Sequence, residues 1–313
     1  MANIVLQLTT EQCKEVKAYY LKYQIERNAP GVAFAAKLPD AAITVYNSGK
    51  VMFQGAGAER EASRFGDMTE SNGVQDSNRI KGDQLPENFS RMSVIGSDET
   101  GTGDYFGPMT VASVYVPKEK IELVKELGVK DSKQLNDDKI REIAPDLIES
   151  CVHSLLILRN DKYNELQSRG FSQGKMKALL HNQAIKHVLQ KISPEKPEYI
   201  LIDQFAERET YYGYIQNEKE IVRDNVLFST KAEQLHVAVA AASIIARYGF
   251  LLEMDRLSSM VGLPLQKGAG HLVDEMAAKI LLEHGENTLR SIAKWHFSNT
   301  EKAKRIYEKM RKG

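Results

Sequence analysis

Two apolar runs in the C-terminal two thirds of the chain end directly in acidic residues, and this feature constrains the fold most. The run SVIG leads through Ser97 into Asp98 and Glu99, and the run YILI leads into Asp203. Carboxylates at the end of a buried strand are costly unless a basic partner or a metal ion satisfies them. In α/β proteins, the strand ends at one edge of the sheet converge on the functional crevice. We therefore expect these acids to meet at one sheet edge.

The segments around these acids alternate between expected strands and expected helices. The further strands are TVASVYV, VHSLLILR and NVLFS, and the helices cover 136–150, 172–191, 234–257 and the residues from 274 onward. Such alternation predicts a mixed α/β sheet flanked by helices. A third candidate acid, Glu233, lies just after LFSTKA at the start of the long helix. Four carboxylates from three segments could therefore meet.

The N-terminal residues predict a separate small domain. NIVLQL, VAFAAKL, AITVYN and VMFQG are typical of strands, and Thr9 or Thr10 can cap a helix that we expect to reach Ile25. Residues 67–90 are rich in Ser, Asn, Asp and Gly and lack an apolar period, which predicts a linker. The expected organisation is a domain over 1–66, a linker over 67–90 and a second domain over 91–313.

The charge balance and the apolar runs exclude several classes of protein. The chain has 42 basic and 42 acidic residues, so any nucleic-acid site must come from local clustering of charge. Two cysteines exclude a disulfide scaffold and a four-cysteine zinc site. No basic segment leads into an apolar run at the start, and the longest apolar run, 237–246, is too short to span a bilayer. We expect a cytoplasmic protein without a membrane partner.

A carboxylate cluster suits hard divalent cations such as Mg²⁺, which bind carboxylate and phosphate oxygens. Two such ions about 4 Å apart can drive phosphodiester hydrolysis. Taken singly, Asp203 could be a helix cap or turn residue, and Glu233 an ordinary acid of a first helical turn. Only their combination with Asp98 and Glu99 indicates a metal site. The glycines that follow form neither GxGxxG nor GxxxxGK[ST], so a dinucleotide loop and a P-loop are disfavoured.

Four motifs carry a resemblance to a known family. SVIGSDETGTGDYFGP resembles the opening motif of the type 2 ribonucleases H, and VKDSKQLN resembles their second motif. YILID and STKAEQLHVAVAAASIIAR are similar to the remaining acidic motifs. The Gly-Thr-Gly turn, the glutamate of KAE and the N-terminal domain make the chain most similar to the bacterial ribonuclease HIII branch. AITVYNSGKVMFQGAGAERE is similar to the TATA-binding-protein-like domain of that branch.

The resemblance implies a ribonuclease H-like α/β domain with a central mixed sheet, preceded by a small α+β TATA-binding-protein-like domain. It implies a monomeric endonuclease that cuts the RNA of RNA–DNA hybrids, leaving 5′-phosphate and 3′-hydroxyl ends, and that removes hybrids and RNA primers during replication and repair. Two Mg²⁺ or Mn²⁺ ions would be bound by Asp98, Glu99, Asp203 and Glu233. Glu233 would either bind one ion or position the attacking water.

Selection of RNA requires contact with the 2′-hydroxyl group. A glycine turn beside the metal-binding acids lets the backbone approach the substrate closely, although a tight turn without a ligand is the alternative. Basic loop residues could bind phosphates, or they could simply face solvent. The candidate substrate contacts are Gly101, Thr102, Gly103, Ser132, Lys133 and Lys231.

One departure from the related ribonuclease HII pattern concerns substrate choice. Ribonuclease HII enzymes have a KGYGT segment whose tyrosine helps to read the RNA–DNA junction, whereas this chain has KGAGH, with Ala269 in place of the tyrosine. Alanine cannot stack on a sugar or base, so we expect runs of RNA to be preferred over single embedded ribonucleotides. The alternatives are a ribonuclease HII-like junction ribonuclease, a non-catalytic hybrid-binding protein, and a related metal nuclease such as a DNA exonuclease, which the GTG and DSK contexts disfavour.

Two expectations lie outside these motifs. His181 falls near the apolar face of the helix 172–191, so we expect a hydrogen-bonded core histidine. In the N-terminal domain one sheet face must pack on the helices, and the other face, with Lys37, Lys50 and Gln54, is available to meet a duplex.

Overall fold

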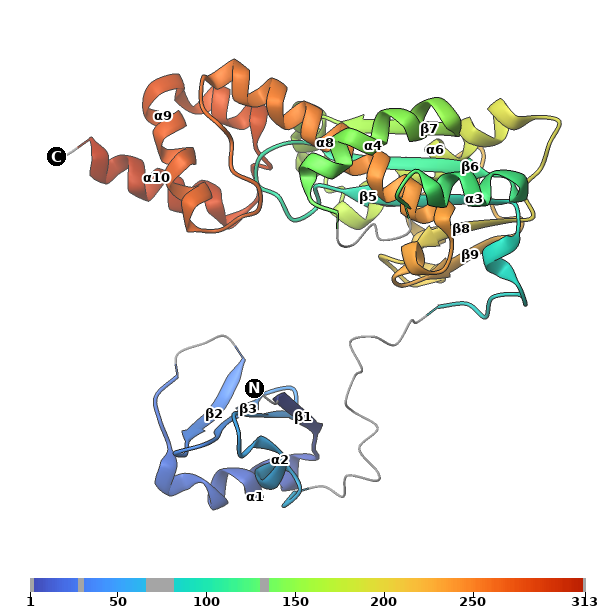
Figure 1. Cartoon of the computed structure of the whole chain (residues 1–313). Coiled ribbons are helices and arrows are strands. Elements are labelled where there is room, and N and C mark those ends of the chain that lie inside the picture. The colour runs from blue at the N-terminus through green and yellow to red at the C-terminus, as the bar shows by residue number, and fades with distance from the viewer. Residues whose placement is uncertain (1–2, 28–30, 66–81, 130–134, 312–313) are drawn as a thin grey trace. The chain divides into compact units, whose positions relative to one another are not determined.

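The computed structural model describes residues 3–27, 31–65, 82–129 and 135–311, and Figure 1 labels its elements. The chain forms two compact units, residues 1–79 and 80–313. This division falls within the predicted linker 67–90, of which 67–81 lie outside the described residues. Residues 82–90 pack on the second unit: Gly82 forms a β-bridge with Ser229, and Phe89 lies in the main core of that unit.

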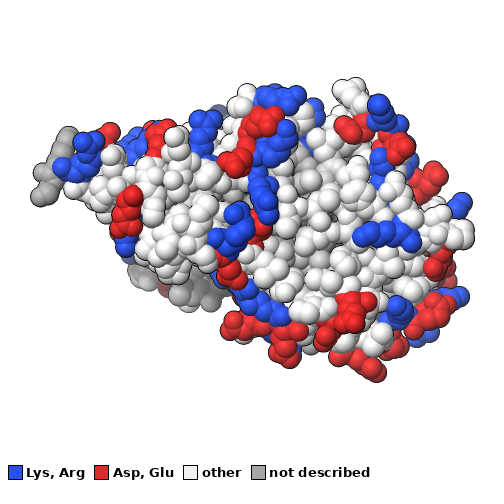
Figure 2. Space-filling view, turned by 90° about the horizontal axis from the view of Figure 1, so that it is seen from above, with Lys and Arg blue, Asp and Glu red and all other residues white. Residues whose placement is uncertain are grey.

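The surface charge is mixed in sign. On the face shown in Figure 2, Lys and Arg side chains form a band across the middle, with Asp and Glu side chains beside them and larger uncharged areas to the right. This distribution agrees with a balanced composition of 42 basic and 42 acidic residues.

The first unit is an antiparallel sheet with helices packed against it. The strand order is β1 (Asn3–Gln7), β4 (Lys50–Gln54), β3 (Ala42–Tyr46) and β2 (Val32–Lys37). Helices α1 (Thr10–Tyr19) and α2 (Ala58–Ala62) share one buried core with alternate strand residues. Alternation leaves the other sheet face free of these helices. The predicted small α+β domain is confirmed.

Helix α1 begins as predicted but ends earlier. Thr9 and Gln12 form a reciprocal capping box at its start. The helix stops at Tyr19, and a 3₁₀ turn, η1 (Leu21–Tyr23), follows. The N–H of Ile25 then donates to the carbonyl of Ala35 in β2 at 2.9 Å. The prediction of a helix to Ile25 was wrong because pairing with the sheet edge satisfies this backbone instead.

The second unit is built on a five-stranded mixed sheet, as predicted. The sheet order is β7 (Val152–Leu158), β6 (Met109–Val116), β5 (Val94–Thr100), β8 (Tyr199–Asp203) and β9 (Val226–Ser229). Strand β6 runs antiparallel to both of its neighbours, β5 and β7, whereas β8 and β9 run parallel to β5.

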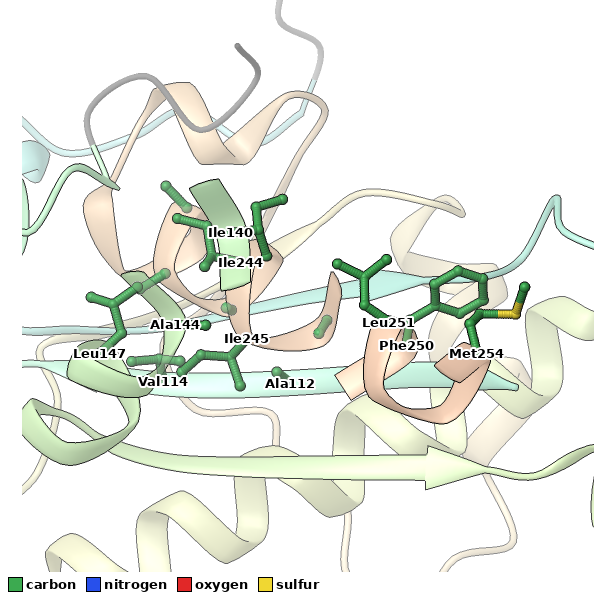
Figure 3. Close-up of a cluster of buried hydrophobic side chains, with 14 of the residues drawn as sticks. Ala112, Val114, Ile140, Ala144, Leu147, Ile244, Ile245, Phe250, Leu251 and Met254 are labelled. Atoms are coloured by element: carbon green, nitrogen blue, oxygen red, sulfur yellow. The ribbon is translucent and has the colours of Figure 1, made fainter. Parts of the chain in front are cut away.

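One face of this sheet is covered by α8 (Val237–Val261), together with α4 (Asp137–Ser150) and the short α3 (Ile121–Glu126). By length and composition α8 could cross a membrane, yet 72% of its most apolar window is buried inside the unit, as in a core helix. Figure 3 shows its contact with α4 above β6, formed by Ile140, Ala144, Leu147, Ile244, Ile245, Ala112 and Val114.

The opposite face is covered by α6 (Gln173–Ile192) and α7 (Arg208–Ile215). Helix α5 (Asn160–Ser168) contributes to a smaller cluster with the start of α6. Helices α9 (His271–Ile292), which is broken at Gly285, and α10 (Ser298–Met310) pack on each other at one end of the unit (Figure 1). The five-stranded sheet is therefore a middle layer between two layers of helices.

Candidate active site

The acidic motif occupies the end of β5, where strand alternation sends its side chains to opposite faces. Gly96 lies against the backbone of α8, and Ser97 bonds to a side chain of α6. Asp98 follows on the α8 side and accepts a hydrogen bond from Ser243 of that helix. Glu99 follows on the α6 side. Two consecutive acids are therefore held by two different helices.

The parallel register of β5 and β8 brings the second strand-end acid beside the first. Ser97 pairs with Ile202, so Asp98 and Asp203 end neighbouring strands side by side. The Asp203 Oδ1 atom accepts a hydrogen bond from the N–H of Ala232 at 2.9 Å. The expected meeting of these acids at one sheet edge is found in the structure.

Glu233 lies in a 3₁₀ turn, η5 (Ala232–Gln234), and not in α8, whose N-cap is His236. The expectation that Glu233 starts the long helix was therefore wrong. Lys231, just before the turn, has a left-handed backbone with φ of 56°, which is unusual for a residue with a long side chain. This conformation directs the Ala232 N–H toward Asp203 and brings Glu233 close enough to act on it electrostatically.

Burial and like charge make two of these carboxylates hard to ionise. Burial raises the pKa of Asp98 well above its usual range, and the charges of Glu99 and Asp203 raise it further. Burial also raises the pKa of Asp203; the Ala232 N–H opposes this, and the charge of Glu233 adds to it. A bound cation would favour the ionised form of each.

Glu99 has the opposite electrostatic environment. Its Oε1 atom accepts a hydrogen bond from Lys177 Nζ at 2.8 Å, and its Oε2 atom lies 2.9 Å from His181 Nε2. Burial acts to raise the pKa of Glu99, but His181 and Lys177 outweigh it, and the pKa is lowered. Glu99 is therefore held by α6, while its neighbour Asp98 is turned toward α8.

Sequence reasoning missed most of this supporting layer. His181 is fully buried and hydrogen-bonded, as expected, but its partners are Glu99 and the Ser97 Oγ atom, 2.7 Å from Nδ1. The signal lay in spacing: Gln173, Lys177 and His181 recur every four residues and form a polar stripe along one side of α6. The stripe faces the acidic strand.

The predicted Gly-Thr-Gly turn directly follows Glu99 and Thr100. A Cβ at Gly101, where φ is +89°, would overlap the Pro108 carbonyl oxygen, so only glycine fits. Thr102 offers its carbonyl to Gln173 Nε2 at 3.0 Å, and its Oγ1 atom is buried without a hydrogen-bond partner among the described residues. Gly103 is exposed, with open space around it.

The chain after this turn is fastened to the segment that replaces KGYGT. The N–H of Gly268 donates to Asp104 Oδ1 at 2.6 Å, and the N–H of Tyr105 donates to the Gly268 carbonyl at 2.9 Å. Ala269 is half-buried, and its carbonyl accepts a hydrogen bond from Asn299 at 2.9 Å. The segment that carries Ala269 therefore lies beside the glycine turn.

A buried lysine holds the same loop from the other side. Lys294 is 0% exposed and donates hydrogen bonds to the carbonyl oxygens of Asp104 at 2.8 Å and Gly107 at 2.6 Å. Burial lowers the pKa of Lys294 to about 7. The backbone that carries the glycine turn is thus anchored at both sides.

Three predicted substrate contacts remain, and of these only Lys231 lies within the described residues. Lys231 is half-buried next to the turn that orients Asp203. Ser132 and Lys133 lie outside the described residues.

The four acids have the donor chemistry for Mg²⁺ or Mn²⁺, since both ions take carboxylate oxygens. The neighbouring carboxylates repel Asp98 and Asp203 and raise the pKa of each, and a bound cation would relieve this repulsion. Within the described ranges, however, no three Asp, Glu, His or Cys side chains are already gathered in a geometry that holds a metal ion. To bind an ion, Glu99 would have to turn an oxygen away from α6, because both of its oxygens are engaged by that helix.

Two family models match the chain. Residues 95–300 match ribonuclease HII, and residues 3–78 match a domain of unknown function (DUF3378). A ribonuclease HIII of Lysinibacillus sphaericus is 64% identical over 307 residues, covering 98% of this chain and 100% of the relative. A ribonuclease HIII of Bacillus subtilis is 50% identical over 313 residues, covering 99% of this chain and 100% of the relative.

Solved structures agree with these matches. The crystal structure of Bst-RNase HIII in complex with Mn²⁺ is 46% identical with a TM-score of 0.70, covering 98% of this chain and 100% of that one. Aquifex aeolicus RNase H3, at 21% identity and a TM-score of 0.55, shares the fold. Because full-length relatives at 50–64% identity carry that name and the second unit matches the related model, this chain belongs to the ribonuclease HIII family.

Proposed function

We propose that this protein hydrolyses the RNA strand of RNA–DNA hybrids internally, giving 5′-phosphate and 3′-hydroxyl ends. The observation that carries this proposal is the position of Asp98 and Asp203 at the ends of two neighbouring parallel strands, with Glu99 and Glu233 in electrostatic reach. The ribonuclease HIII relatives support the activity. The solved Mn²⁺ complex of Bst-RNase HIII supports a metal requirement.

Two Mg²⁺ or Mn²⁺ ions would be held by Asp98, Glu99, Asp203 and Glu233. When bound, such a pair supplies an activated water for attack on phosphorus and charge that stabilises the departing 3′-oxygen. The protein itself orients the carboxylates: Ser243 donates to Asp98, and the Ala232 N–H donates to Asp203. Glu233, on its short turn, either binds one ion or positions the water.

The Gly-Thr-Gly turn would distinguish RNA from DNA. It begins two residues after Glu99, and its exposed Gly103 leaves the backbone open to a sugar. A 2′-hydroxyl can donate to a backbone carbonyl of this turn or accept from one of its backbone N–H groups. Lys231, Ser132 and Lys133 would bind the phosphates of the hybrid, and binding should therefore weaken as salt increases.

We also propose that the enzyme prefers runs of RNA over single embedded ribonucleotides. The residue that replaces the junction-reading tyrosine, Ala269, is half-buried and packs against the main core. Its methyl side chain supplies no aromatic surface of its own for stacking on a sugar or base.

The first unit would bind the hybrid through the sheet face that its helices leave uncovered. Lys37 and Lys50 are exposed, and alternation places them with Gln54 on the face opposite the core. Arg27 extends this face, since its guanidinium donates to Thr44 Oγ1 at 2.9 Å. The monomeric state and the cytoplasmic location expected from the sequence belong to the same proposal.

A cleavage assay on labelled strands tests the activity. It compares a continuous RNA–DNA hybrid, a DNA duplex with one ribonucleotide, double-stranded RNA and double-stranded DNA, each with and without Mg²⁺ or Mn²⁺. We expect metal-dependent internal cuts in the RNA of the hybrid, and we expect Asp98→Asn to lose them.

The same assay separates the alternatives. Equal or better cutting at the single ribonucleotide would identify a ribonuclease HII-like junction enzyme. Tight hybrid binding without cutting, in either metal, would identify a non-catalytic hybrid-binding protein. Cutting of double-stranded DNA would identify a different metal nuclease.

A further inference from the structure

A lysine occupies the acidic centre together with the carboxylates. Lys177 Nζ lies 2.8 Å from Glu99 Oε1, and both side chains are only 12% exposed. Salt screens such a partly buried pair much less than a surface ion pair. His181 Nε2 engages the other oxygen of Glu99 at 2.9 Å, so the carboxylate is held from both sides by α6.

Lys177 also has a second favourable contact within reach. Its Nζ atom lies 4.2 Å from the centre of the Phe205 ring, which in turn stacks on His181 with ring centres 5.3 Å apart. An ammonium group over an aromatic face is stabilised by the charge distribution of the ring. The cation can therefore remain near the acids even when its bond to Glu99 is weakened.

Glu99 has two competing attractions in this arrangement. As a proposed metal ligand it must turn an oxygen toward the ions, but in the structure both oxygens face α6. Among the described residues, the acids do not yet form a geometry that holds a metal ion. A divalent ion that enters must share Glu99 with Lys177 and must tolerate its positive charge.

We propose that Lys177 is a resident cation of the active site that competes with the metal for Glu99 and lowers the metal affinity of the substrate-free enzyme. This inference rests on the proposed metal centre. Coupling between two ligands at distinct sites typically changes affinity about 5- to 150-fold, and we take this range as the scale for a charge that competes for one ligand of the metal. Removal of the charge should therefore tighten metal binding, whereas removal of a merely structural contact should not.

The experiment measures Mn²⁺ binding to the full-length enzyme without nucleic acid, from the electron paramagnetic resonance signal of free Mn²⁺ at a fixed pH. Lys177→Met removes the charge and keeps much of the length of the side chain, and Lys177→Gln provides a polar neutral variant should the first not fold. Lys177→Arg keeps the charge. Lys186→Met is the matched control, because Lys186 lies on the same helix and pairs with the exposed Glu220, away from the acids.

We expect Lys177→Met or Lys177→Gln to bind Mn²⁺ at least about fivefold more tightly than wild type. Lys177→Arg and Lys186→Met should stay close to wild type. Unchanged affinity in the neutral variants would overturn the proposal and leave Lys177 a structural role. Weaker affinity would also overturn it, because Lys177 would then hold Glu99 in place for the metal.

The design separates this inference from the metal centre on which it rests. Asp98→Asn should weaken Mn²⁺ binding in the wild-type background. If neither wild type nor the neutral Lys177 variants bind Mn²⁺, or if Asp98→Asn binds it as tightly as wild type, the metal centre itself is overturned, and the competition with it. If the Mn²⁺ affinity depends on Asp98 but is the same with and without the charge of Lys177, only the proposed competition is overturned.

Discussion

Replacement of Gly96 by alanine tests how the active site is built from β5 and α8. Gly96 lies two residues before Asp98, with the backbone of α8 directly against it. An added Cβ would overlap the Val239 nitrogen and the Ala238 carbonyl carbon, and would lie 2.6 Å from the Ala238 oxygen. These are backbone atoms in a long core helix, so no side-chain rotation can relieve the overlap.

The size of the effect follows from this geometry. Ordinary contact begins at 3.4 Å, so strand and helix must separate by roughly 1 Å, and a gap of that size forfeits up to about half of the dispersion energy of the facing atoms. Overpacking of a rigid core costs about 1–3 kcal/mol and occasionally more. We therefore expect Gly96→Ala to lower the free energy of unfolding by about 3 kcal/mol.

Urea unfolding followed by tryptophan fluorescence is a suitable assay. Trp295 is the single tryptophan of the chain and packs against the main core of the second unit, so its signal reports that unit. Gly213→Ala is the matched control: Gly213 is exposed in α7, and an added Cβ meets nothing within 4 Å. Better helix propensity should make this control neutral or more stable by about 0.5–1 kcal/mol.

Activity should change together with stability. Separation of β5 from α8 moves Asp98 away from Ser243, so Gly96→Ala should also lose cleavage at temperatures where it remains folded. A loss of stability below about 1 kcal/mol would refute the reasoning, because overpacking of a rigid core typically costs at least that much. So would full activity in a strongly destabilised variant, because strand displacement and carboxylate position would then be independent.

Three further predictions concern charge and substrate choice. In EDTA, Asp98→Asn should gain stability relative to wild type as pH rises above about 4, because an acid with a raised pKa costs stability once it must ionise; a pH-independent difference in urea midpoint would contradict this. Burial lowers the pKa of Lys294 to about 7, so wild type should gain stability over Lys294→Met between about pH 7 and 9, where the unfolded chain binds the extra proton; equal slopes would disprove it. Ala269→Tyr should raise the ratio of single-ribonucleotide cutting to hybrid cutting, whereas Ala269→Leu should not; parallel effects of both would show that size and not stacking matters.

The strand-end acids were predictable because their positions follow from local pattern and sheet geometry. Apolar runs that end in carboxylates, as at Asp98 and Asp203, predict strands whose charged ends share one edge, and parallel pairing of β5 with β8 places them together. The mixed sheet and its covering helices follow from the same alternation. The Gly-Thr-Gly turn was predictable as well, since a backbone with φ of +89° at Gly101 requires glycine.

Features that depend on contacts distant in sequence were not predictable in this way. The end of α1 is determined by the backbone pairing of Ile25 with Ala35. The spacing of apolar residues along a helix carries no information about such a contact. Residues 82–90 have the composition of a linker, yet Phe89 belongs to the main core. Glu233 resembles an acid of a first helical turn until the left-handed Lys231 and the helix start at Val237 are known.

The two faces of the sheet explain why the pKa values of two neighbouring acids shift in opposite directions. Asp98 faces the largely apolar α8, where the hydroxyl of Ser243 and the N–H of Glu99 do not balance its burial and the two nearby charges. Glu99, one residue later, faces the polar stripe of α6 and is stabilised as an anion by Lys177 and His181. A bound cation would therefore stabilise the ionised form of Asp98, which has no basic partner in these contacts. Glu99, in contrast, is already paired with the cation of Lys177. This asymmetry follows directly from the alternation of a strand between an apolar and a polar helix, and under the proposed competition Lys177 of α6 would set the metal affinity without any change to the acids.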